Sequence, residues 1–230
     1  MNVVVTGASK GIGFAIAQKF AGEGANLAIC SRNEKEIAQI GEQLGGAERV
    51  LAIPTDMSKK EDVANFASQI LDQWQTIDVL VNNAGSFVPG NIHDEPDGNL
   101  ELMINTNLYS AYYLTRALLP AITKQKGSYI FNISSVAGLQ AYNGGGSYSI
   151  SKFALSGFSK NLRHELIEKN VRVSTVYPGA VYTASWDGSG IDENRIMPAT
   201  DIANVIWNSY KMSDRTVVED IVLRPQLGDL

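Results

Sequence analysis

The sequence predicts a doubly wound α/β fold, in which helices cover both faces of a parallel sheet. Two observations predict it. Short apolar runs alternate with longer segments of helical period along the whole chain, as repeated strand–helix units require. Several of the short runs, such as Val3-Val4-Val5 and Val79-Leu80-Val81, are continuously apolar, as expected for strands that are buried on both faces.

The two kinds of segment place the elements in order along the chain. We expect strands at 3–5, 26–30, 50–53, 78–81, 129–134, 171–176 and 221–223, which makes a sheet of about seven strands. Between them, helices are expected at 11–21, 34–44, 58–74, 99–122, 147–169 and 201–212. Ser58 and Glu61 match a capping box at the start of the third helix. The long irregular segment at about 179–198 is expected to form a loop over the site, because ligands of such sheets bind beyond the carboxyl ends of the strands.

Composition and charge exclude several classes of protein. The 230 residues are 44% hydrophobic and 19% charged, which suits one sizeable core, and no linker divides residues 1–230 into domains. The net charge of −5, with no run of Lys and Arg, argues against nucleic acid or an anionic membrane as a partner. No apolar stretch approaches the roughly 18 residues of a membrane span, and no signal peptide is recognisable, so a soluble, cytoplasmic protein is expected. One cysteine, Cys30, allows neither an internal disulfide nor a multi-cysteine metal site, and we expect no metal.

A cluster of glycines follows the first predicted strand. Gly7, Gly11 and Gly13 stand directly before a helix. Glycines there permit a tight turn and a close approach to a pyrophosphate, and the helix N-terminus supplies amide donors for the phosphates. The spacing differs from the G-x-G-x-x-G pattern of two-domain dehydrogenases. Taken alone, the motif is also compatible with a turn that binds no ligand.

A second signal is the pair Tyr148 and Lys152 near a predicted helix start. Residues four apart share one face of a helix, so the phenol and the ammonium group can face one site. A free tyrosine titrates near 10, and lowering that pKa by about 3 units takes roughly 4 kcal/mol. A unit charge about 4 Å away, at an effective dielectric near 20, supplies about that much. The pair therefore suits a general acid–base, although a solvated helix face is the alternative.

Two further motifs complete a pattern. Asn82-Asn83-Ala84-Gly85 follows the fourth strand, and Ser135, at the end of the fifth, lies 13 residues before Tyr148. In this order, with the glycine turn and Y-x-x-x-K, they resemble the short-chain dehydrogenase/reductase family in its shorter, single-domain branch, over residues 3–183. The resemblance implies a Rossmann-like sheet and an oxidoreductase that transfers a hydride between a nicotinamide cofactor and a carbonyl or secondary alcohol.

The resemblance also implies the catalytic residues. Tyr148 matches the proton donor to the substrate carbonyl, which accepts the proton during oxidation. Lys152 would hold the ribose hydroxyls of the nicotinamide half and lower the pKa of the tyrosine. Ser135 matches the hydroxyl that hydrogen-bonds the substrate oxygen. Asn107 matches the helix asparagine that positions a water for proton relay, with Asn105 as the competing match and a helix-kinking role as the alternative.

For the cofactor, the resemblance implies contacts from six parts of the chain. Asp56 and Met57 match a pair that contacts adenine, although Asp56 also suits a plain turn. Positions 83 and 85 match the adenosine ribose channel, and 178–183 the segment that binds the nicotinamide carboxamide. The full set is Gly7, Ser9, Lys10, Gly11, Ile12, Gly13, Arg32, Asp56, Met57, Asn83, Gly85, Tyr148, Lys152, Pro178, Gly179, Val181 and Thr183.

The end of the second strand bears on the choice between NAD and NADP. An acidic residue there would bind the ribose 2′-hydroxyl and repel a 2′-phosphate. This chain has Ser31-Arg32-Asn33 and no carboxylate. Arg32 offers a planar donor fork suited to phosphate, and Lys10 adds a second cation. We therefore expect NADP(H), although each residue alone could be a solvated surface cation.

Two helices suggest a protein partner. The helices at about 99–122 and 147–169 are apolar on more than one face, so each must be covered on both sides. In the resembled family these helices commonly form a dimer, often within a tetramer. We expect a homodimer or homotetramer through them.

The sequence thus predicts an NADP-dependent carbonyl reductase or alcohol dehydrogenase with a small-molecule substrate. Residues 219–225 resemble branches that handle hydroxy acids or small alcohols more than acyl-carrier-protein reductases. Trp186 and Tyr182 could shape the substrate pocket. One alternative is a non-catalytic NADP(H)-binding redox sensor, which would not need the proton-transfer residues. Another is an epimerase or dehydratase, which would need a larger substrate region after the sixth strand.

Overall fold

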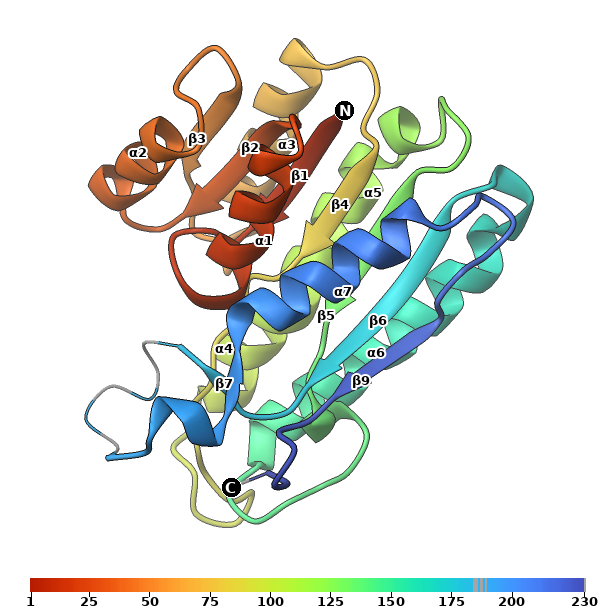
Figure 1. The fold of residues 1–230 in the computed structure, drawn as a ribbon. Helices are drawn as coiled ribbons and strands as arrows, with labels where there is room; N and C mark the ends of the chain where they lie inside the picture. The colour runs from red at the N-terminus through yellow and green to blue at the C-terminus, as the bar shows by residue number, and fades with distance from the viewer. Residues whose placement is uncertain (184–185, 187, 189, 230) are drawn as a thin grey trace.

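Seven parallel strands form the central sheet of the computed structural model, which describes residues 1–183, 186, 188 and 190–229 (Figure 1). The strand order is β3-β2-β1-β4-β5-β6-β9, with every neighbouring pair parallel. The predicted doubly wound fold is confirmed. The strands are β1 (Asn2–Thr6), β2 (Asn26–Ser31), β3 (Val50–Pro54), β4 (Val79–Asn82), β5 (Tyr129–Ile133), β6 (Arg172–Pro178) and β9 (Asp220–Leu223).

Two apolar cores lie on the two faces of the sheet. Successive strand residues point to opposite faces, so Val3 and Val5 enter one core while Val4 enters the other. The first core receives α1 (Gly11–Gly22), α2 (Glu34–Gln43) and α7 (Ala199–Lys211). The second receives α3 (Lys60–Gln73), α5 (Ser110–Ile122) and α6 (Gly146–Leu166). Burial on both faces explains why the strands read as continuous apolar runs.

The strand order reverses between β1 and β4, and this reversal positions the site. The chain runs outward from β1 through β2 to β3, then crosses back to β4 on the other side of β1. Helices leave the carboxyl ends of these two strands in opposite directions, which opens a crevice there. Polar residues lie at or next to the ends of the neighbouring strands, with Thr6 last on β1, Asn82 last on β4 and Asn132 next to last on β5. The crevice is thus bordered by polar groups above an apolar sheet.

The helix predicted at 99–122 is not continuous. It consists of α4 (Asn99–Ile104), a π-helical turn at Asn105–Tyr109 and then α5. Side chains bond back to the backbone here, since Thr106 Oγ1 donates to the Leu102 carbonyl at 2.8 Å and Ser110 Oγ to the Thr106 carbonyl at 2.5 Å. The π-helical turn inserts an extra residue, and such turns often occur at functional sites.

The predicted capping box is wrong. The helix α3 begins at Lys60, and no side chain caps it. Ser58 instead donates both its backbone N–H, at 3.0 Å, and its hydroxyl, at 2.7 Å, to the Asp56 carboxylate. In a capping box the serine oxygen would accept from a backbone N–H, whereas here the serine donates twice to an ionised carboxylate, a strong acceptor, and forms a turn with Asp56.

The expected loop at about 179–198 contains regular structure. Two short strands, β7 (Val181–Tyr182) and β8 (Met197–Pro198), pair in parallel near its ends. A 3-10 turn at Glu193–Arg195 precedes β8. Residues 184, 185, 187 and 189 of the predicted loop lie outside the described residues.

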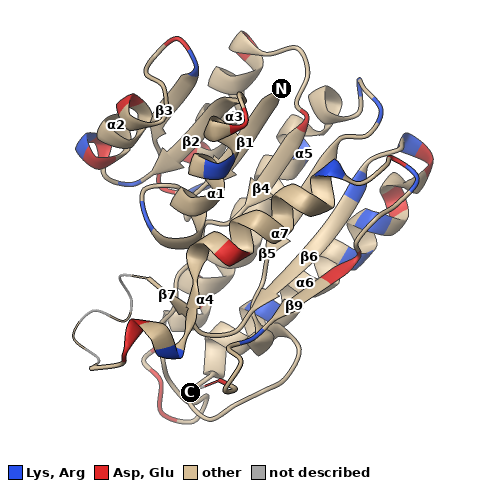
Figure 2. Cartoon of the chain, in the orientation of Figure 1, with Lys and Arg blue, Asp and Glu red and all other residues tan. Residues whose placement is uncertain are grey.

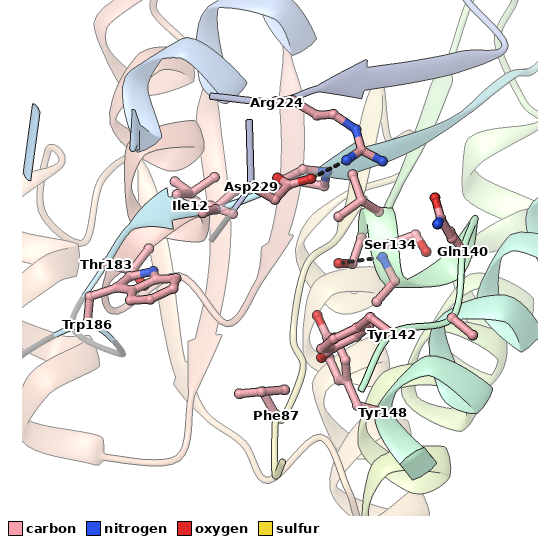
Figure 3. A pocket seen from close by; sticks show the side chains of 18 residues that line it. Ile12, Phe87, Ser134, Gln140, Tyr142, Tyr148, Thr183, Trp186, Arg224 and Asp229 are labelled. Carbon is pink, nitrogen blue, oxygen red and sulfur yellow. Dashed lines mark hydrogen bonds and ion pairs between the residues drawn. The ribbon is translucent and has the colours of Figure 1, made fainter. Parts of the chain in front are cut away.

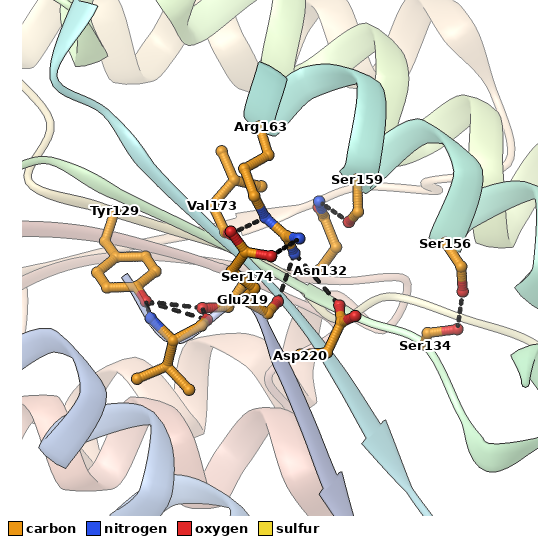
Figure 4. A network of polar contacts seen from close by, with 11 residues as sticks. Tyr129, Asn132, Ser134, Ser156, Ser159, Arg163, Val173, Ser174, Glu219 and Asp220 are labelled. Carbon is orange, nitrogen blue, oxygen red and sulfur yellow. Dashed lines mark hydrogen bonds and ion pairs between the residues drawn. The ribbon is translucent and has the colours of Figure 1, made fainter. Parts of the chain in front are cut away.

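Arg163 of α6 fastens the last strand to the sheet (Figure 4). Its Nε donates to the Val173 carbonyl at 2.9 Å, and its Nη2 donates to the Glu219 carbonyl. It also forms ion pairs with the side chains of Glu219 and Asp220, at 3.1 and 3.2 Å. These contacts fix the edge strand β9, from which the chain continues toward the crevice.

The surface carries charges of both signs in mixture, as Figure 2 shows for helices on both sides of the sheet. Within the described part of the chain, no helix combines the length and the apolar character that crossing a membrane requires.

Candidate active site

A cavity of about 560 Å³ lies at the carboxyl ends of β5 and β6 (Figure 3). Its volume is within the range of pockets that hold drug-sized ligands. Ser135 and Tyr148 contribute polar groups to its wall, and Phe87, Tyr142 and Trp186 contribute aromatic rings. The segment from 178 to 183, which was predicted to bind nicotinamide, lines the same cavity through Pro178, Gly179, Ala180, Val181 and Thr183.

The structure brings Ser135 and Tyr148 together. Ser135 follows β5 and opens a 3-10 turn, where its Oγ accepts a hydrogen bond from Ala137 N at 3.1 Å. Tyr148 lies in the first turn of α6, and its phenol is near enough to the Ser135 side chain for that hydroxyl group to lower its pKa. Neighbouring Ser134 also lines the cavity, but its hydroxyl donates to the Lys152 carbonyl at 3.1 Å. The two hydroxyl groups on the cavity wall could therefore contact one ligand oxygen.

The pKa of Tyr148 differs from the sequence-based expectation. Burial raises it to about 12, the hydrogen bond from Ser135 lowers it, and nearby Tyr142 raises it. The net pKa of Tyr148 thus lies above the ordinary value of a tyrosine, where the sequence predicted a value below it. Burial of the phenol outweighs other influences, because the tyrosinate loses its solvation there. The neutral phenol, with its proton, is therefore the stable form throughout the physiological range.

Lys152 lies one helical turn after Tyr148 and faces the same site. Its Nζ is 5.7 Å from the centroid of the Tyr148 ring and donates to the Ile133 carbonyl at 2.9 Å. The side chain is buried, and this burial lowers its pKa to about 8. The ammonium group is held between the end of β5 and the face of α6 that carries Tyr148.

Asn107 occupies the π-helical turn and is also buried. Its Oδ1 accepts from Ser86 N at 2.7 Å, and its Nδ2 donates to the Ser86 carbonyl at 3.0 Å and to Ser151 Oγ at 2.8 Å. A Cβ added to Gly85 would lie 3.1 Å from Asn107 Oδ1 and 3.5 Å from Lys152 Nζ. The backbone at Gly85 thus packs closely against both side chains. The hydrogen bonds to residues 86 and 151 come from Asn107 and not from Asn105, the competing match.

The glycine turn is shaped by contacts to the end of β4. Gly7 has a left-handed φ of +65°, and a Cβ on Gly13 would collide with the Gly7 carbonyl oxygen. Asn83 Nδ2 donates to the carbonyls of Thr6 and Gly7, at 2.9 and 3.0 Å. Thr6 Oγ1 in turn accepts from the backbone amides of Asn83 and Ala84. Asn83 therefore stabilises the turn through hydrogen bonds to its backbone, a role that sequence reasoning did not assign to it.

The beginning of α1 fits an anionic group. Its N-cap is Lys10, which makes no side-chain capping bond, and its first turn contains no acidic residue. The first amides of a helix lack intrahelical acceptors, and the helix dipole favours negative charge there. Ile12 from this turn lines the cavity, and Thr183 packs against Gly11, where an added Cβ would lie 3.0 Å from its Cγ2. A pyrophosphate at this turn would therefore extend directly toward the cavity.

The two candidate 2′-phosphate ligands, Lys10 and Arg32, are both exposed. The expectation that no carboxylate lies near them needs correction, because Asp56 interacts electrostatically with Arg32. Burial raises the pKa of Asp56, but the hydrogen bonds from Ser58 and the charges of Lys59 and Arg32 together hold it below its usual value. Met57, the second residue of the predicted adenine pair, is buried.

Sequence reasoning missed several residues of the cavity. The ring of Phe87 meets that of Tyr148 edge to face, with centroids 4.8 Å apart, and Tyr142 lies beside Tyr148 (Figure 3). Arg224 and Asp229 reach the cavity from the segment after β9. These residues lie in loops without a local pattern, so only the folded chain reveals them.

Glu95 is a further missed residue, which supports the start of α6. Its carboxylate accepts hydrogen bonds from the hydroxyl and, at 3.4 Å, from the backbone N–H of Ser147, next to Tyr148. A carboxylate at a helix N-terminus is favoured by the helix dipole. Among the described residues, no group of three or more His, Cys, Asp and Glu side chains could hold a metal ion.

The burial of Lys152 predicts that the stability of the fold depends on pH. Its pKa is about 8 in the folded chain and about 10.4 in an unfolded one, so the unfolded chain binds more protons between these values. The free energy of unfolding should therefore rise with pH in this window. Relative to Lys152→Met, wild-type stability should increase by about 2 kcal/mol from pH 7.5 to 9.5, measured by urea denaturation. If the free energies of unfolding of the wild type and Lys152→Met differ by the same amount at every pH, this prediction is contradicted.

Comparisons with known proteins show which family this chain resembles. A profile of the family described as short chain dehydrogenase matches residues 1–194. A sepiapterin reductase of Chlorobaculum tepidum is 36% identical over 99% of this chain and 97% of that protein. A metagenomic short-chain oxidoreductase solved in complex with NADP is 32% identical over 98% of this chain and 97% of that one, with a TM-score of 0.83. The closed form of a serine dehydrogenase complexed with NADP⁺ is 27% identical, with a TM-score of 0.92 over 100% of this chain and 97% of that one.

Proposed function

Because this chain belongs to the short-chain dehydrogenase/reductase family, we propose that it is an NADP(H)-dependent oxidoreductase that interconverts a carbonyl compound and an alcohol. The observation that carries the proposal is the meeting of Ser135 and Tyr148 on the wall of one cavity, beside the segment 178–183. A general acid must lie within hydrogen-bond reach of the atom that it protonates. These two hydroxyl groups meet that requirement for one carbonyl oxygen.

In the proposed reaction, Ser135 Oγ donates a hydrogen bond to the substrate carbonyl oxygen and polarises it. NADPH, when bound, supplies the hydride to the carbonyl carbon, and NADP⁺ takes it back in the reverse direction. Tyr148 gives its phenolic proton to the oxygen, which becomes the alcohol hydroxyl. The tyrosinate that remains lies next to the ammonium group of Lys152, whose charge stabilises it.

Tyr148 must then regain a proton. Lys152 lies between the phenol and the Asn107 region, and Asn107 carries hydrogen bonds to Ser86 and Ser151. We assign Asn107 to this relay, with the π-helical turn holding its amide in place. The low pKa of the lysine, about 8, suits a group that passes protons near neutral pH.

NADP(H) is the proposed cofactor. The capless start of α1 would hold the pyrophosphate, and Lys10 and Arg32 would bind the 2′-phosphate. The NADP and NADP⁺ complexes of the related structures support this choice. A non-catalytic redox sensor is not favoured, because such a protein has no need for Ser135, Tyr148 and Lys152 to be gathered at one cavity.

We expect the enzyme to act as a homodimer or homotetramer. Large apolar side chains stand exposed on the helices that were predicted to carry the interface. They are Leu100 and Leu102 on α4, Tyr109 and Tyr112 at the following turn and on α5, and Ile150 and Phe153 on α6, each between 37% and 45% exposed. A second copy of the chain would remove this surface from water.

The function is tested by following absorbance while ketones, aldehydes, diketones and keto acids are offered with NADPH or NADH. We expect the wild type to turn over with NADPH and to have a higher kcat/KM with NADPH than with NADH. In Arg32→Asp the ratio of these two kcat/KM values should fall at least about tenfold. The control variant is Lys35→Asp, which alters an exposed cation on α2. Preference for NADH by the wild type would contradict the cofactor proposal, and NADPH binding without any turnover would contradict the reaction.

A further inference from the structure

We propose that Asp229 is a second recognition point in the cavity, which binds an N–H group of the substrate. The substrate class is a carbonyl compound, or its alcohol, with a flat and mostly apolar body that carries an amino, amide or amino-heterocycle nitrogen. The inference rests on the proposed function, because it takes Ser135 and Tyr148 as the groups that bind the carbonyl oxygen.

Asp229 and Arg224 form an ion pair on the cavity wall. Arg224 Nη1 donates to Asp229 Oδ2, and both side chains line the cavity that Ser135 and Tyr148 also line (Figure 3). The Asp229 side chain is 28% exposed, so part of it is accessible from the cavity. A ligand held at the two hydroxyl groups could therefore extend to this pair.

The segment that carries Asp229 is held in place by several contacts. Gly179 N donates to the Leu223 carbonyl at 2.8 Å, and Gly228 N to the Pro225 carbonyl at 2.9 Å. Arg195 reaches across from the loop before β8 and donates to the carbonyls of residues 227 and 228, at 3.3 and 2.9 Å. The backbone that carries this carboxylate is thus held relative to the sheet, as the support of a recognition group must be.

The carboxylate of Asp229 uses little of its capacity to accept hydrogen bonds. Two carboxylate oxygens offer about four acceptor positions, and Arg224 fills one. Oδ1 is buried against Gly179 and has no hydrogen-bond partner among residues 1–183, 186, 188 and 190–229. A buried acceptor without a donor costs free energy, which a ligand donor would recover. The terminal torsion of aspartate is broad, so a rotation about Cβ–Cγ can turn either oxygen toward the cavity.

The charges around the pair favour an N–H group over a carboxylate. The guanidinium of Arg224 is already paired, so an anionic substrate would have to compete with Asp229 for it. An N–H donor would add to the pair without displacing either member. The rest of the cavity offers the rings of Phe87, Tyr142 and Trp186, which suit a flat ligand body. This differs from the hydroxy acids that residues 219–225 suggested.

The test uses ketones that differ in one group. In 3′- and 4′-aminoacetophenone an NH₂ group replaces the CH₃ group of 3′- and 4′-methylacetophenone, at nearly the same size. Their Kd values for the NADP⁺-loaded protein are measured by calorimetry, and their kcat/KM values with NADPH by absorbance. For at least one ring position, the preference for the amino ketone over the methyl ketone, in Kd and in kcat/KM, should fall about tenfold or more in Asp229→Leu. This fall should come from weaker binding of the amino ketone, while the values for the methyl ketone stay unchanged.

Three controls separate recognition from damage to the fold. The Asp229→Leu variant should keep its melting temperature and its Kd for NADPH. Glu193→Leu, which changes an exposed carboxylate outside the cavity lining, should leave the preference unchanged. The third control is 3-acetylbenzoate, which should bind more weakly than the amino ketones.

The outcomes distinguish this inference from the proposed function. An amino-to-methyl preference that is the same in wild type and Asp229→Leu overturns the role of Asp229, even if the ketones are reduced. Tighter binding of 3-acetylbenzoate overturns it too, because Arg224 would then be the group that selects the substrate. A preference in Kd that depends on Asp229, without any NADPH oxidation, would support the recognition site and contradict the proposed reaction.

Discussion

Replacing Tyr148 by phenylalanine is expected to lower kcat for carbonyl reduction at least about 100-fold and to leave the Kd for NADPH within about threefold. The substitution removes only the phenolic oxygen, so the ring keeps its edge-to-face contact with Phe87. Burial keeps the phenol protonated, with a pKa near 12, and its proton is the one placed beside Ser135. Without it, no group at this position can protonate the substrate oxygen.

The matched control is Tyr142→Phe. Tyr142 lies beside Tyr148 and lines the same cavity, so its hydroxyl group is in a similar environment. The mechanism gives that hydroxyl no proton to transfer, and we expect kcat to change less than about tenfold. Steady-state rates give kcat, and fluorescence titration with NADPH gives the Kd. Equal losses in the two variants would contradict the assignment of Tyr148 as the general acid.

Gly13→Ala is expected to raise the Kd for NADPH at least about 100-fold, because the added Cβ would collide with the backbone at Gly7. The obstacles are a buried carbonyl oxygen and the Asn83 amide that braces the turn, and neither is the free end of a flexible side chain. The turn must shift to make room, and the amides that would bind the pyrophosphate shift with it. We also expect a loss of stability of about 1–3 kcal/mol from overpacking.

Gly22→Ala, at the other end of α1, is the control for that prediction. A Cβ at Gly22 would meet nothing within 4 Å, so the turn is undisturbed and the Kd for NADPH should stay within about twofold. Alanine is a better helix former than glycine, and stability should rise by up to about 1 kcal/mol. Calorimetric titration and urea denaturation give both quantities. Unchanged NADPH binding in Gly13→Ala would show that the glycine turn does not hold the cofactor.

The sheet and its helices could be predicted from the sequence because their signal is local. Continuous apolar runs mark strands covered on both faces, and the seven predicted strands agree with the observed ones to within about two residues at each end. The meeting of Tyr148 and Lys152 could be predicted for the same reason, since helical spacing alone places them on one face. Ser135 and Asn107 could be predicted as site residues because the motifs around them match those of the resembled family.

Competing local hydrogen bonds and contacts between distant segments could not be predicted. The capping box failed because the Asp56 carboxylate attracts Ser58, and the helix at 99–122 is interrupted where Thr106 and Ser110 bond to the backbone. The pKa of Tyr148 depends on how deeply the phenol is buried, which no spacing reveals. Asp229 reaches the cavity only because its segment is pinned against β6 and the loop before β8.

The central claim is that this cavity reduces a carbonyl group with NADPH. The most direct test offers wild-type enzyme a ketone from the panel together with NADPH deuterated at the transferable position of the nicotinamide, and analyses the product by mass spectrometry. We predict one deuterium atom on the carbon that bears the new hydroxyl group, and no such product with Tyr148→Phe on the same timescale. Consumption of NADPH without deuterium on that carbon would contradict the account.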